Sequence, residues 1–285
     1  MTVSLLKGRV LATGIRFGEG PRWHKGELWF SDMHAQRVMR MAADGQLSEA
    51  VTVPKDPSGL GWLPDGRLLV VSMLDRRLLC WDGASLSQHA DLSALAAHPC
   101  NDMVVDAMGR AYVGHFGFDK WGGSTPTNAS LLCAEPDGSV REVAPQLNFP
   151  NGLVITPDGQ TLVVAESYGG RLTAFSIERN GDLSGRRLWA DMPEMGVPDG
   201  ICMDTEGGIW VALPRSKQCI RVREGGEVTH HIALEQGAFA CMLGGGDGKT
   251  LYVMTAASSD RERCRQDLTG RVEAFDAPYP RAGLP

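Results

Sequence analysis

The sequence has 285 residues, 43% of them hydrophobic, and its 34 acidic and 28 basic side chains give a net charge of −6. This acidic balance argues against nucleic acid as a partner. No apolar run approaches the roughly 20 residues of a membrane span, and the N-terminus has neither a long apolar core nor a cleavage signature, so we expect a cytoplasmic protein with no membrane contact.

The predicted secondary structure consists of strands and turns, because 35 glycines and 16 prolines interrupt short apolar segments. In chain order, the clearest strands are expected at residues 67–74, 110–116, 161–167, 208–213 and 250–256. Only residues 91–98, DLSALAAH, are expected to be briefly helical. The pattern therefore predicts an all-β protein.

Six similar segments recur about 40 to 50 residues apart, which is the spacing of propeller blades. Each contains an apolar strand, a tight turn and a second apolar strand, as in NGLVITPDGQTLVVAES. The segments begin at Glu19, Ser58, Asn101, Asn151, Asp199 and Ala240, a group that we call the axial set. Weaker third and fourth strands follow, so we predict one domain, residues 1–285, folded as a six-bladed β-propeller with four-stranded blades. The last copy lacks a fourth strand, and we expect the N-terminal residues 8–13 to close the sixth blade.

The chemistry of the axial set points to a metal ion. In a propeller the first strand of each blade lines the central channel, so these side chains are expected to converge on one axis. Two carboxylates and two amides buried together would repel or stay unsatisfied without a cation. An all-oxygen set suits a hard divalent ion, and the absence of His and Cys disfavours a dedicated zinc site. The alternative is that each polar residue only forms a turn, since Asn-Gly and Asp-Gly are common turn pairs.

The seven cysteines do not change this interpretation. They are odd in number and are never spaced as C-x-x-C. Neither a disulfide framework nor a thiolate metal site is therefore expected, and we predict buried reduced thiols.

Three segments, GEGPRW, PNGLVITPDG and PDGICMDTEGGIWVA, resemble the regucalcin/gluconolactonase (luciferin-regenerating enzyme) family of six-bladed propellers. The resemblance spans the chain from Glu19 to the final RVEAF. It implies that Glu19, Asn151 and Asp199 bind a single divalent cation, with Ca²⁺ expected and Mg²⁺, Mn²⁺, Zn²⁺ or Fe²⁺ as alternatives. It also implies that Asn101 meets the substrate or reaches the metal through water.

The resemblance implies a lactonase, and the substrate would be a sugar (aldono-) lactone such as gluconolactone. The metal would polarise the lactone carbonyl, and Asp199 would activate the attacking water as general base. The regucalcin branch has an Arg two residues before its channel Asn, where this chain has Pro99, so substrate identity is the weakest part of the likeness. An acid in a following loop of that branch falls on Asp119.

Further substrate contacts are expected in the loops that follow the second strand of each blade, because those loops return to the face that carries the axial set. We predict that His115, Asp119, Trp121, Tyr168 and Arg215 face the substrate. The alternative for each is a solvated loop residue without such a role.

Two other functions remain open at this stage. The same axial set would serve a calcium-dependent phosphotriesterase-type hydrolase like diisopropylfluorophosphatase, because its ligands suit a phosphoryl group as well as a carbonyl. A non-catalytic calcium-binding propeller is the second alternative. For the lactonase we expect a small-molecule lactone as the partner, and a monomer or a small homo-oligomer.

Overall fold

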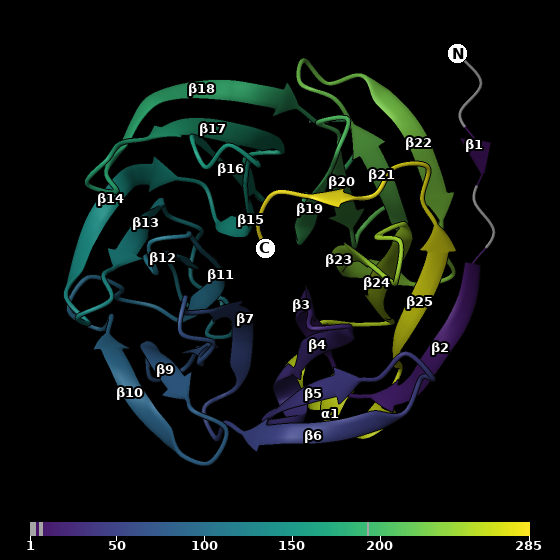
Figure 1. Cartoon of the computed structure of the whole chain (residues 1–285), viewed down its shortest axis with the longest axis horizontal. Coiled ribbons are helices and arrows are strands. Elements are labelled where there is room, and N and C mark those ends of the chain that lie inside the picture. Colours follow the sequence, from purple (N-terminus) through teal and green to yellow (C-terminus); the bar gives the residue numbers. More distant parts are fainter. Residues whose placement is uncertain (1–3, 6–7, 193) are drawn as a thin grey trace.

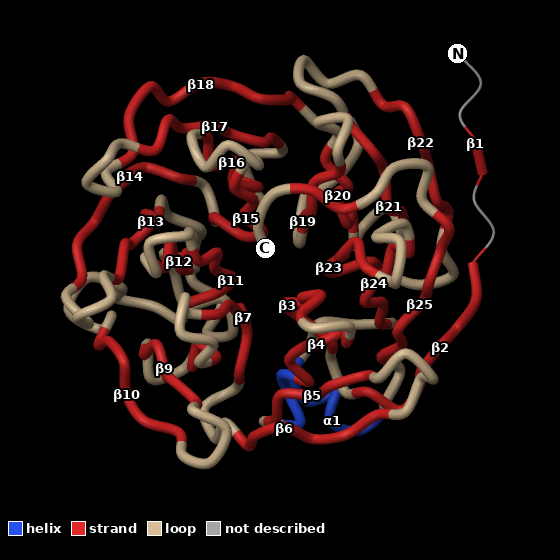
Figure 2. The backbone as a smooth tube through the Cα atoms, in the orientation of Figure 1, coloured by secondary structure: helices blue, strands red, loops and turns tan. Residues whose placement is uncertain are grey.

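The computed structural model describes residues 4–5, 8–192 and 194–285. Six sheets stand around a common axis like the blades of a propeller (Figure 1), and all their strand pairs are antiparallel except that of the two-residue edge strand Ser4–Leu5. Each contains four consecutive strands or their equivalent, which confirms the prediction of an all-β, six-bladed β-propeller. Strands form nearly all of the regular structure, and the helical segments η1 and α1 pack together near blade 1 (Figure 2).

The first three blades follow the order of the chain from the axis outward. Blade 1 comprises β3 (Gly18–His24), β4 (Glu27–Asp32), β5 (Arg37–Met41) and β6 (Leu47–Thr52). Blade 2 comprises β7 (Pro57–Trp62), β8 (Leu68–Ser72), β9 (Arg77–Trp81) and β10 (Leu86–Asp91). Blade 3 comprises β11 (Cys100–Val105), β12 (Ala111–His115), β13 (Ala129–Ala134) and β14 (Val140–Leu147). The segment η1 (Met33–Ala35) lies between β4 and β5.

The last three blades include both ends of the chain. Blade 4 comprises β15 (Pro150–Ile155), β16 (Thr161–Glu166), β17 (Arg171–Ile177) and β18 (Leu183–Asp191). Blade 5 comprises β19 (Ile201–Asp204), β20 (Ile209–Leu213), β21 (Gln218–Val222) and β22 (Val228–Ala233), to which β1 (Ser4–Leu5) and β26 (Arg281–Ala282) add at the two edges. Blade 6 comprises β23 (Gly237–Gly244), β24 (Thr250–Ala256), β25 (Gly270–Asp276) and β2 (Gly8–Ile15), with α1 (Arg261–Asp267) between β24 and β25.

The N-terminal segment closes the ring, as predicted. Strand β2 pairs antiparallel with β25, from Gly8 opposite Phe275 to Ile15 opposite Gly270. In Figure 1, β2 runs along the outer edge of blade 6 beside β25. Because the last blade contains strands from both ends of the chain, its pairing covers an edge that would otherwise be open.

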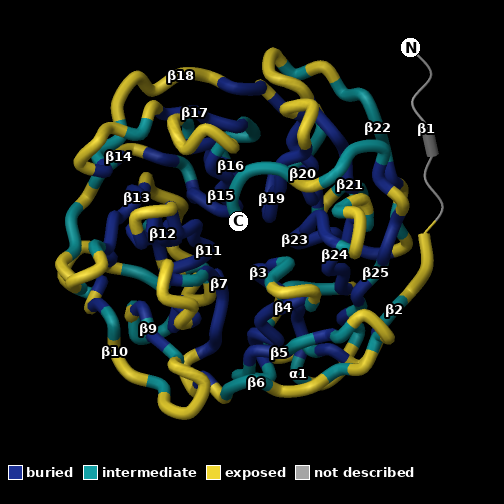
Figure 3. Tube along the Cα trace, viewed as in Figure 1, coloured by how far each residue is buried: buried dark blue, intermediate teal, exposed yellow. Residues whose placement is uncertain are grey.

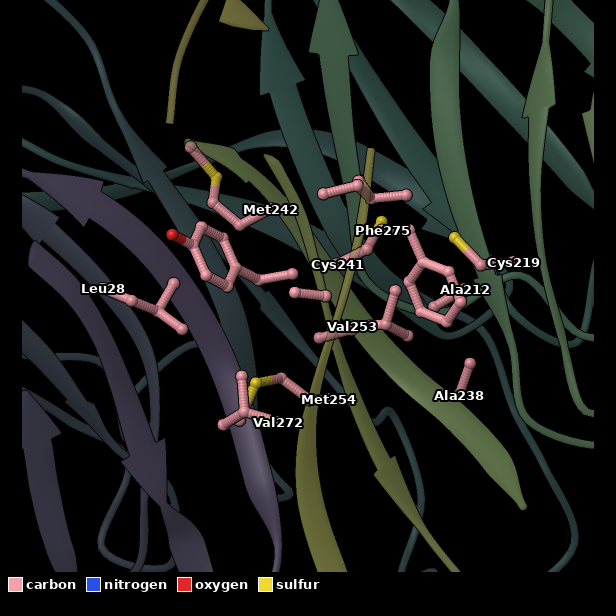
Figure 4. Packing of buried hydrophobic residues seen from close by; sticks show 14 of the residues in the cluster. Leu28, Ala212, Cys219, Ala238, Cys241, Met242, Val253, Met254, Val272 and Phe275 are labelled. Carbon is pink, nitrogen blue, oxygen red and sulfur yellow. The ribbon is translucent and has the colours of Figure 1, made fainter. Parts of the chain in front are cut away.

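The hydrophobic pattern explains why the strands stand as packed blades. Inner strands such as β8, with sequence LLVVS, are buried at every position, because the sheet is covered by a neighbouring blade on both faces. Outer strands such as β6 and β10 are largely half-buried or exposed, and Figure 3 shows this change from the axis to the rim. Figure 4 shows the packing around blade 6, where Met254 and Phe275 lie among residues of blades 1 and 5.

The helix prediction for residues 91–98 is wrong. The segment forms the end of β10 and a single turn, in which the Ala96 amide donates to Leu92 O at 2.8 Å. The Asp91 carboxylate accepts from the Ser93 amide at 2.9 Å, a local hydrogen bond that favours a turn over a helix. The one α-helix among the described residues is instead Arg261–Asp267, where the carboxylate of Asp260 caps the first turn by accepting from the Arg263 amide.

All seven cysteines are free and buried, as predicted. In the part of the chain that the structure describes, no helix has the length and apolarity needed to cross a membrane.

Candidate metal and active site

The axial set lies where the pairing of the innermost strands is interrupted. Between β3 and β4 the register shifts between Glu19 and Arg22, and between β15 and β16 it shifts between Pro150 and Leu153. The first strands of blades 2, 3 and 6 have equivalent shifts. Such irregularities change the direction in which the nearby side chains point. The interruptions therefore free these side chains from the alternating pattern of a regular strand.

The glycine that follows several axial residues permits close contact between blades. A Cβ on Gly152 would lie 2.6 Å from Asp199 O, and a Cβ on Gly200 would lie 2.6 Å from the Cα of Ala240. The Gly152 amide donates to Asp199 O at 3.2 Å. The Asn-Gly and Asp-Gly pairs are therefore not turns here, because their glycines let neighbouring first strands approach each other.

Four axial residues meet in one pocket of about 310 Å³, namely Glu19, Asn101, Asn151 and Asp199. Each is at least nine-tenths buried. The loops after the second strands line the same pocket, and they include three of the predicted substrate residues, Trp121, Tyr168 and Arg215. The expected face of the propeller therefore carries both groups of residues.

Two predicted substrate residues do not line this pocket. His115 is buried at the end of β12, where its Nε2 accepts from the amide of Ser130 on β13 at 3.1 Å. Burial lowers the pKa of His115 to about 4, so its ring is neutral at physiological pH. Asp119 is exposed and accepts from the Gly122 amide at 2.8 Å. Both side chains hold the blade 3 loop in shape from outside the pocket.

The negative charges of the two pocket carboxylates, Glu19 and Asp199, are poorly balanced by neighbouring groups. Burial raises the pKa of Glu19 well above its usual range, and the charges of Asp199 and Asp102 raise it further. Burial also raises the pKa of Asp199, to about 7, although the charge of Lys120 and a hydrogen bond from Asn151 oppose the shift. Burial and neighbouring negative charge both favour the neutral acid. The pocket therefore has an unmet requirement for positive charge.

The atoms around these carboxylates fit a hard cation. Asp199 Oδ1 and Asn101 Nδ2 are buried without a hydrogen-bond partner. Asn151 donates its amide nitrogen to Ser167 Oγ at 3.1 Å, and Ser167 donates to Pro198 O at 2.7 Å, which leaves the Asn151 amide oxygen as a ligand atom. No group of three His, Cys, Asp or Glu side chains that could hold a metal occurs among the described residues. Any ion at this position would therefore use amide oxygens and water or substrate in addition to the two carboxylates, which is the chemistry of Ca²⁺.

The sequence did not single out Lys120, one of two basic side chains, with Arg215, that line this pocket. Its Nζ lies 5.5 Å from the centre of the Phe116 ring and 5.8 Å from that of Phe149. Contacts of this type hold an ammonium against aromatic faces. Lys120 lies in the loop between β12 and β13, and the corresponding loops of the other blades differ from it in sequence, so the alignment of repeats gave no signal for it.

A second missed element is His34, which lines the pocket from η1. Its Nδ1 lies 3.4 Å from Asp56 Oδ2, and Arg261 of α1 lies 3.2 Å from the same carboxylate. Asp56 has a positive φ of 60°, a backbone conformation that costs free energy unless its surroundings hold it. The only α-helix of the described chain thus contacts Asp56, which in turn contacts the pocket residue His34. Arg261 and Asp56 are 205 residues apart in the sequence.

A third missed residue, Arg22, lies next to the axial set. It is buried, and its Nη2 donates to Asp102 Oδ1 at 2.7 Å and to Met103 O at 2.6 Å. Its Nε and Nη1 donate to Leu60 O and Pro21 O. Because Arg22 forms an ion pair with Asp102, Glu19 and Asp199 are the carboxylates of the described site that have no ion-pair partner.

Comparisons with known proteins agree with this architecture. Residues 17–257 match the family model described as SMP-30/Gluconolactonase/LRE-like region. The chain is similar to pentonolactonase XacC of Haloferax volcanii, with 27% identity over 264 residues that cover 87% of this chain and 84% of the relative. It is 30% identical over 286 residues to regucalcin of Gallus gallus, covering 94% and 95% of the two chains. A solved structure of a calcium-binding protein, regucalcin, from Agrobacterium tumefaciens has a TM-score of 0.80 at 23% identity, with 99% of each chain covered, and this likeness shows the fold.

Proposed function

Because the chain belongs to the SMP-30/gluconolactonase/LRE-like family, we propose that it is a lactonase that works with one divalent cation held by Glu19, Asn151 and Asp199. The observation that carries the metal is the pair of buried carboxylates with raised pKa values beside unpartnered polar atoms. We propose Ca²⁺ as the ion, since a structural neighbour is described as calcium-binding and the ligand set is all oxygen.

A cation bound there would supply Lewis-acid polarisation of the lactone carbonyl. Asp199 offers Oδ1, an oxygen without a protein partner, to accept a proton from the water that attacks the carbonyl carbon. The proton then passes to the ring oxygen as the bond between carbonyl carbon and ring oxygen breaks, which yields a hydroxy acid. Asn101 Nδ2 is the free donor available to hold the substrate oxygen in place.

Ser167 and Lys120 would support this chemistry without touching the breaking bond. Ser167 fixes the plane of the Asn151 amide, so that the amide oxygen is already oriented before metal binds. Lys120 places a positive charge close enough to oppose the raised pKa of both carboxylates. Its charge would also stabilise negative charge that develops on the substrate.

The names of the relatives suggest a sugar lactone as the first substrate to test. The decisive experiment measures ring opening of sugar lactones, simple aliphatic lactones and one phosphotriester by the calcium-loaded protein, with and without a strong chelator. We expect lactone opening that the chelator abolishes. Turnover that survives the chelator would contradict the metal role, and faster cleavage of the phosphotriester would favour the phosphotriesterase alternative.

Variants separate the metal ligands from the rest of the axial set. We expect Asn151→Ala to weaken Ca²⁺ binding in a calorimetric titration, whereas Ser58→Ala, at the equivalent position of blade 2, should bind Ca²⁺ like the wild type. Asp199→Asn should abolish turnover while it keeps the fold. A variant that retains more than about a tenth of the wild-type rate would remove Asp199 from the role of base. Calcium binding without turnover of any compound would favour a non-catalytic propeller.

A further inference from the structure

The walls of the pocket differ in character from its metal-binding floor. We propose that the preferred substrate is a lactone that carries a flat apolar group, in place of the polyhydroxylated sugar lactone that the relatives suggest. This inference rests on the proposed lactonase function and concerns the part of the substrate that lies away from the ester.

One wall is a continuous aromatic surface from blades 3 and 4. The rings of Phe116 and Phe149 are stacked with centres 4.7 Å apart and an interplanar angle of 21°. Trp121 lies 5.4 Å from Phe116, and Tyr168 lies 5.0 Å from Phe149. All four side chains line the pocket. Trp121 and Tyr168 are tilted by 53° and 46° against their neighbours, so the four rings form an angled aromatic wall against which another ring can pack.

The other wall comes from blades 1, 2 and 6. Phe17 packs edge-on against Phe239 with ring centres 4.7 Å apart, and it stacks on His34 at 5.3 Å. Met33 and Met73 complete this side of the pocket. Methionine side chains adapt their shape to neighbouring groups and pack well against aromatic rings. The pocket is therefore apolar on both sides of its opening.

The polar groups that remain uncommitted are outnumbered by the apolar and aromatic side chains of the lining. Glu19, Asn151 and Asp199 are committed to the metal, and Ser167 is committed to Asn151 and Pro198. His34 is engaged through Nδ1 with Asp56. Besides these, the lining offers Asn101, Lys120, Arg215 and Ser259, together with the hydroxyl of Tyr168 and the ring nitrogen of Trp121.

A sugar lactone carries a hydroxyl on nearly every ring carbon, and each hydroxyl pressed against a phenyl ring loses its hydrogen bonds to water. Such a loss weakens binding by roughly tenfold for each unpaired group. The pocket volume of about 310 Å³ also lies at the small end for ligand sites, which suits one lactone ring with one compact substituent.

The test compares the opening of three six-membered lactones by the calcium-loaded wild-type protein. They are δ-valerolactone, the same lactone with a phenyl group on a ring carbon remote from the ester, and δ-gluconolactone. We expect kcat/KM for the phenyl lactone to exceed that for each of the other two by about tenfold or more, after division by the rate of hydroxide-catalysed opening. A higher kcat/KM for δ-gluconolactone would overturn this proposal and leave the lactonase intact.

Trp121→Ala tests the aromatic wall directly. Trp121 is 38% exposed, so its truncation should not prevent folding. We expect the ratio of kcat/KM for the phenyl lactone to that for δ-valerolactone to fall by about fivefold or more. Met108→Ala is the matched control, because Met108 is 68% exposed in the turn between β11 and β12, at the opposite end of blade 3.

An unchanged ratio in Trp121→Ala, or an equal fall in Met108→Ala, would overturn the assignment of the wall. If the wild type opens none of the three lactones with Ca²⁺ bound, the proposed function fails and this inference fails with it.

Discussion

Replacing Asp199 by Asn should stabilise the metal-free protein and at the same time remove its response to calcium. The pKa of Asp199 is raised from 3.8 to about 7 in the fold, mainly by burial. At 1.36 kcal/mol for each pKa unit, ionising this buried group costs on the order of 4 kcal/mol of folding stability at neutral pH. Asn keeps the shape of the side chain and removes the charge. The midpoint of thermal unfolding at pH 8 should therefore rise by about 8 °C, at roughly 2 °C per kcal/mol for a chain of this size.

The pH dependence of the metal-free wild type follows from the same shift. The folded state binds a proton at Asp199 more tightly than the unfolded state, because the folded pKa is the higher one. Stability should therefore fall as the pH rises from about 4 to about 7, and it should level off above that range. The pKa of Glu19 is raised in the same direction and adds to the fall. Asp199→Asn should show a shallower dependence over this window.

A sufficient concentration of calcium should make the wild type unfold at a higher temperature than Asp199→Asn, which reverses the order expected without metal. Ligand that binds only the folded state adds about 2.7 kcal/mol at a hundred times its Kd and about 4.1 kcal/mol at a thousand times its Kd. The wild-type midpoint should therefore pass that of Asp199→Asn once Ca²⁺ exceeds about a thousand times the wild-type Kd, while the midpoint of Asp199→Asn stays nearly unchanged. Differential scanning fluorimetry in EDTA and in CaCl₂ at pH 5, 6, 7 and 8 measures all four curves. Asp247→Asn is the control, since this exposed turn carboxylate should change neither curve. If Asp199→Asn is less stable than the wild type in EDTA at pH 8, the idea that metal relieves an uncompensated buried charge is wrong.

Three further outcomes follow from named contacts. Arg22→Ala should lower the free energy of unfolding, measured in urea, by about 3 to 5 kcal/mol, because it leaves a buried carboxylate and three backbone carbonyls without their donor. Arg9→Ala is the control, since Arg9 belongs to an exposed ion pair, and it should change this free energy by less than about 1 kcal/mol. Gly200→Ala should lower the free energy of unfolding by about 1 to 3 kcal/mol in the same assay, because its Cβ would overlap the next blade. Gly246 has open space around it, so Gly246→Ala should change this free energy by no more than about 0.5 kcal/mol. Equal effects of the two substitutions would refute the argument that Gly200 permits close contact between blades. Ser167→Ala should weaken calorimetric Ca²⁺ affinity by about tenfold with little change in the unfolding midpoint of the metal-free protein, and an unchanged affinity would show that the Asn151 amide needs no support.

The architecture could be predicted because its signal is local and repeated. Each blade begins with an apolar strand, a turn and a second strand, and the repetition of this unit places Glu19, Asn151 and Asp199 at equivalent positions. Equivalent positions converge in a closed ring, so the composition of the pocket floor followed from the alignment of repeats alone. The closing strand at residues 8–13 followed from the same count, since blade 6 lacked its fourth strand.

Predictions failed where the outcome depended on the direction of a single side chain or on a short segment outside the repeated strands. His115 ends an inner strand and was expected to face the substrate, but its ring turns toward Ser130 within the blade. The short helix was placed at 91–98 instead of 261–267, because seven or eight residues carry too little periodicity to distinguish a helix from a turn. Lys120 lies between two residues that the sequence did single out, yet its position over two phenyl rings depends on how the loop folds back.

The sequence by itself determined the all-β propeller, the closure of its last blade and the polar floor of its pocket. These properties depend on alternation along a strand and on repetition along the chain, and both can be read without knowing which blades touch. Only the tertiary structure decided which other side chains lie beside that polar floor and form the walls above it. The ion pair of Arg22 with Asp102 joins residues 80 positions apart, and the aromatic walls join loops of five different blades. Such contacts exist only once the ring has closed, because no local pattern specifies which side chains two distant loops bring together.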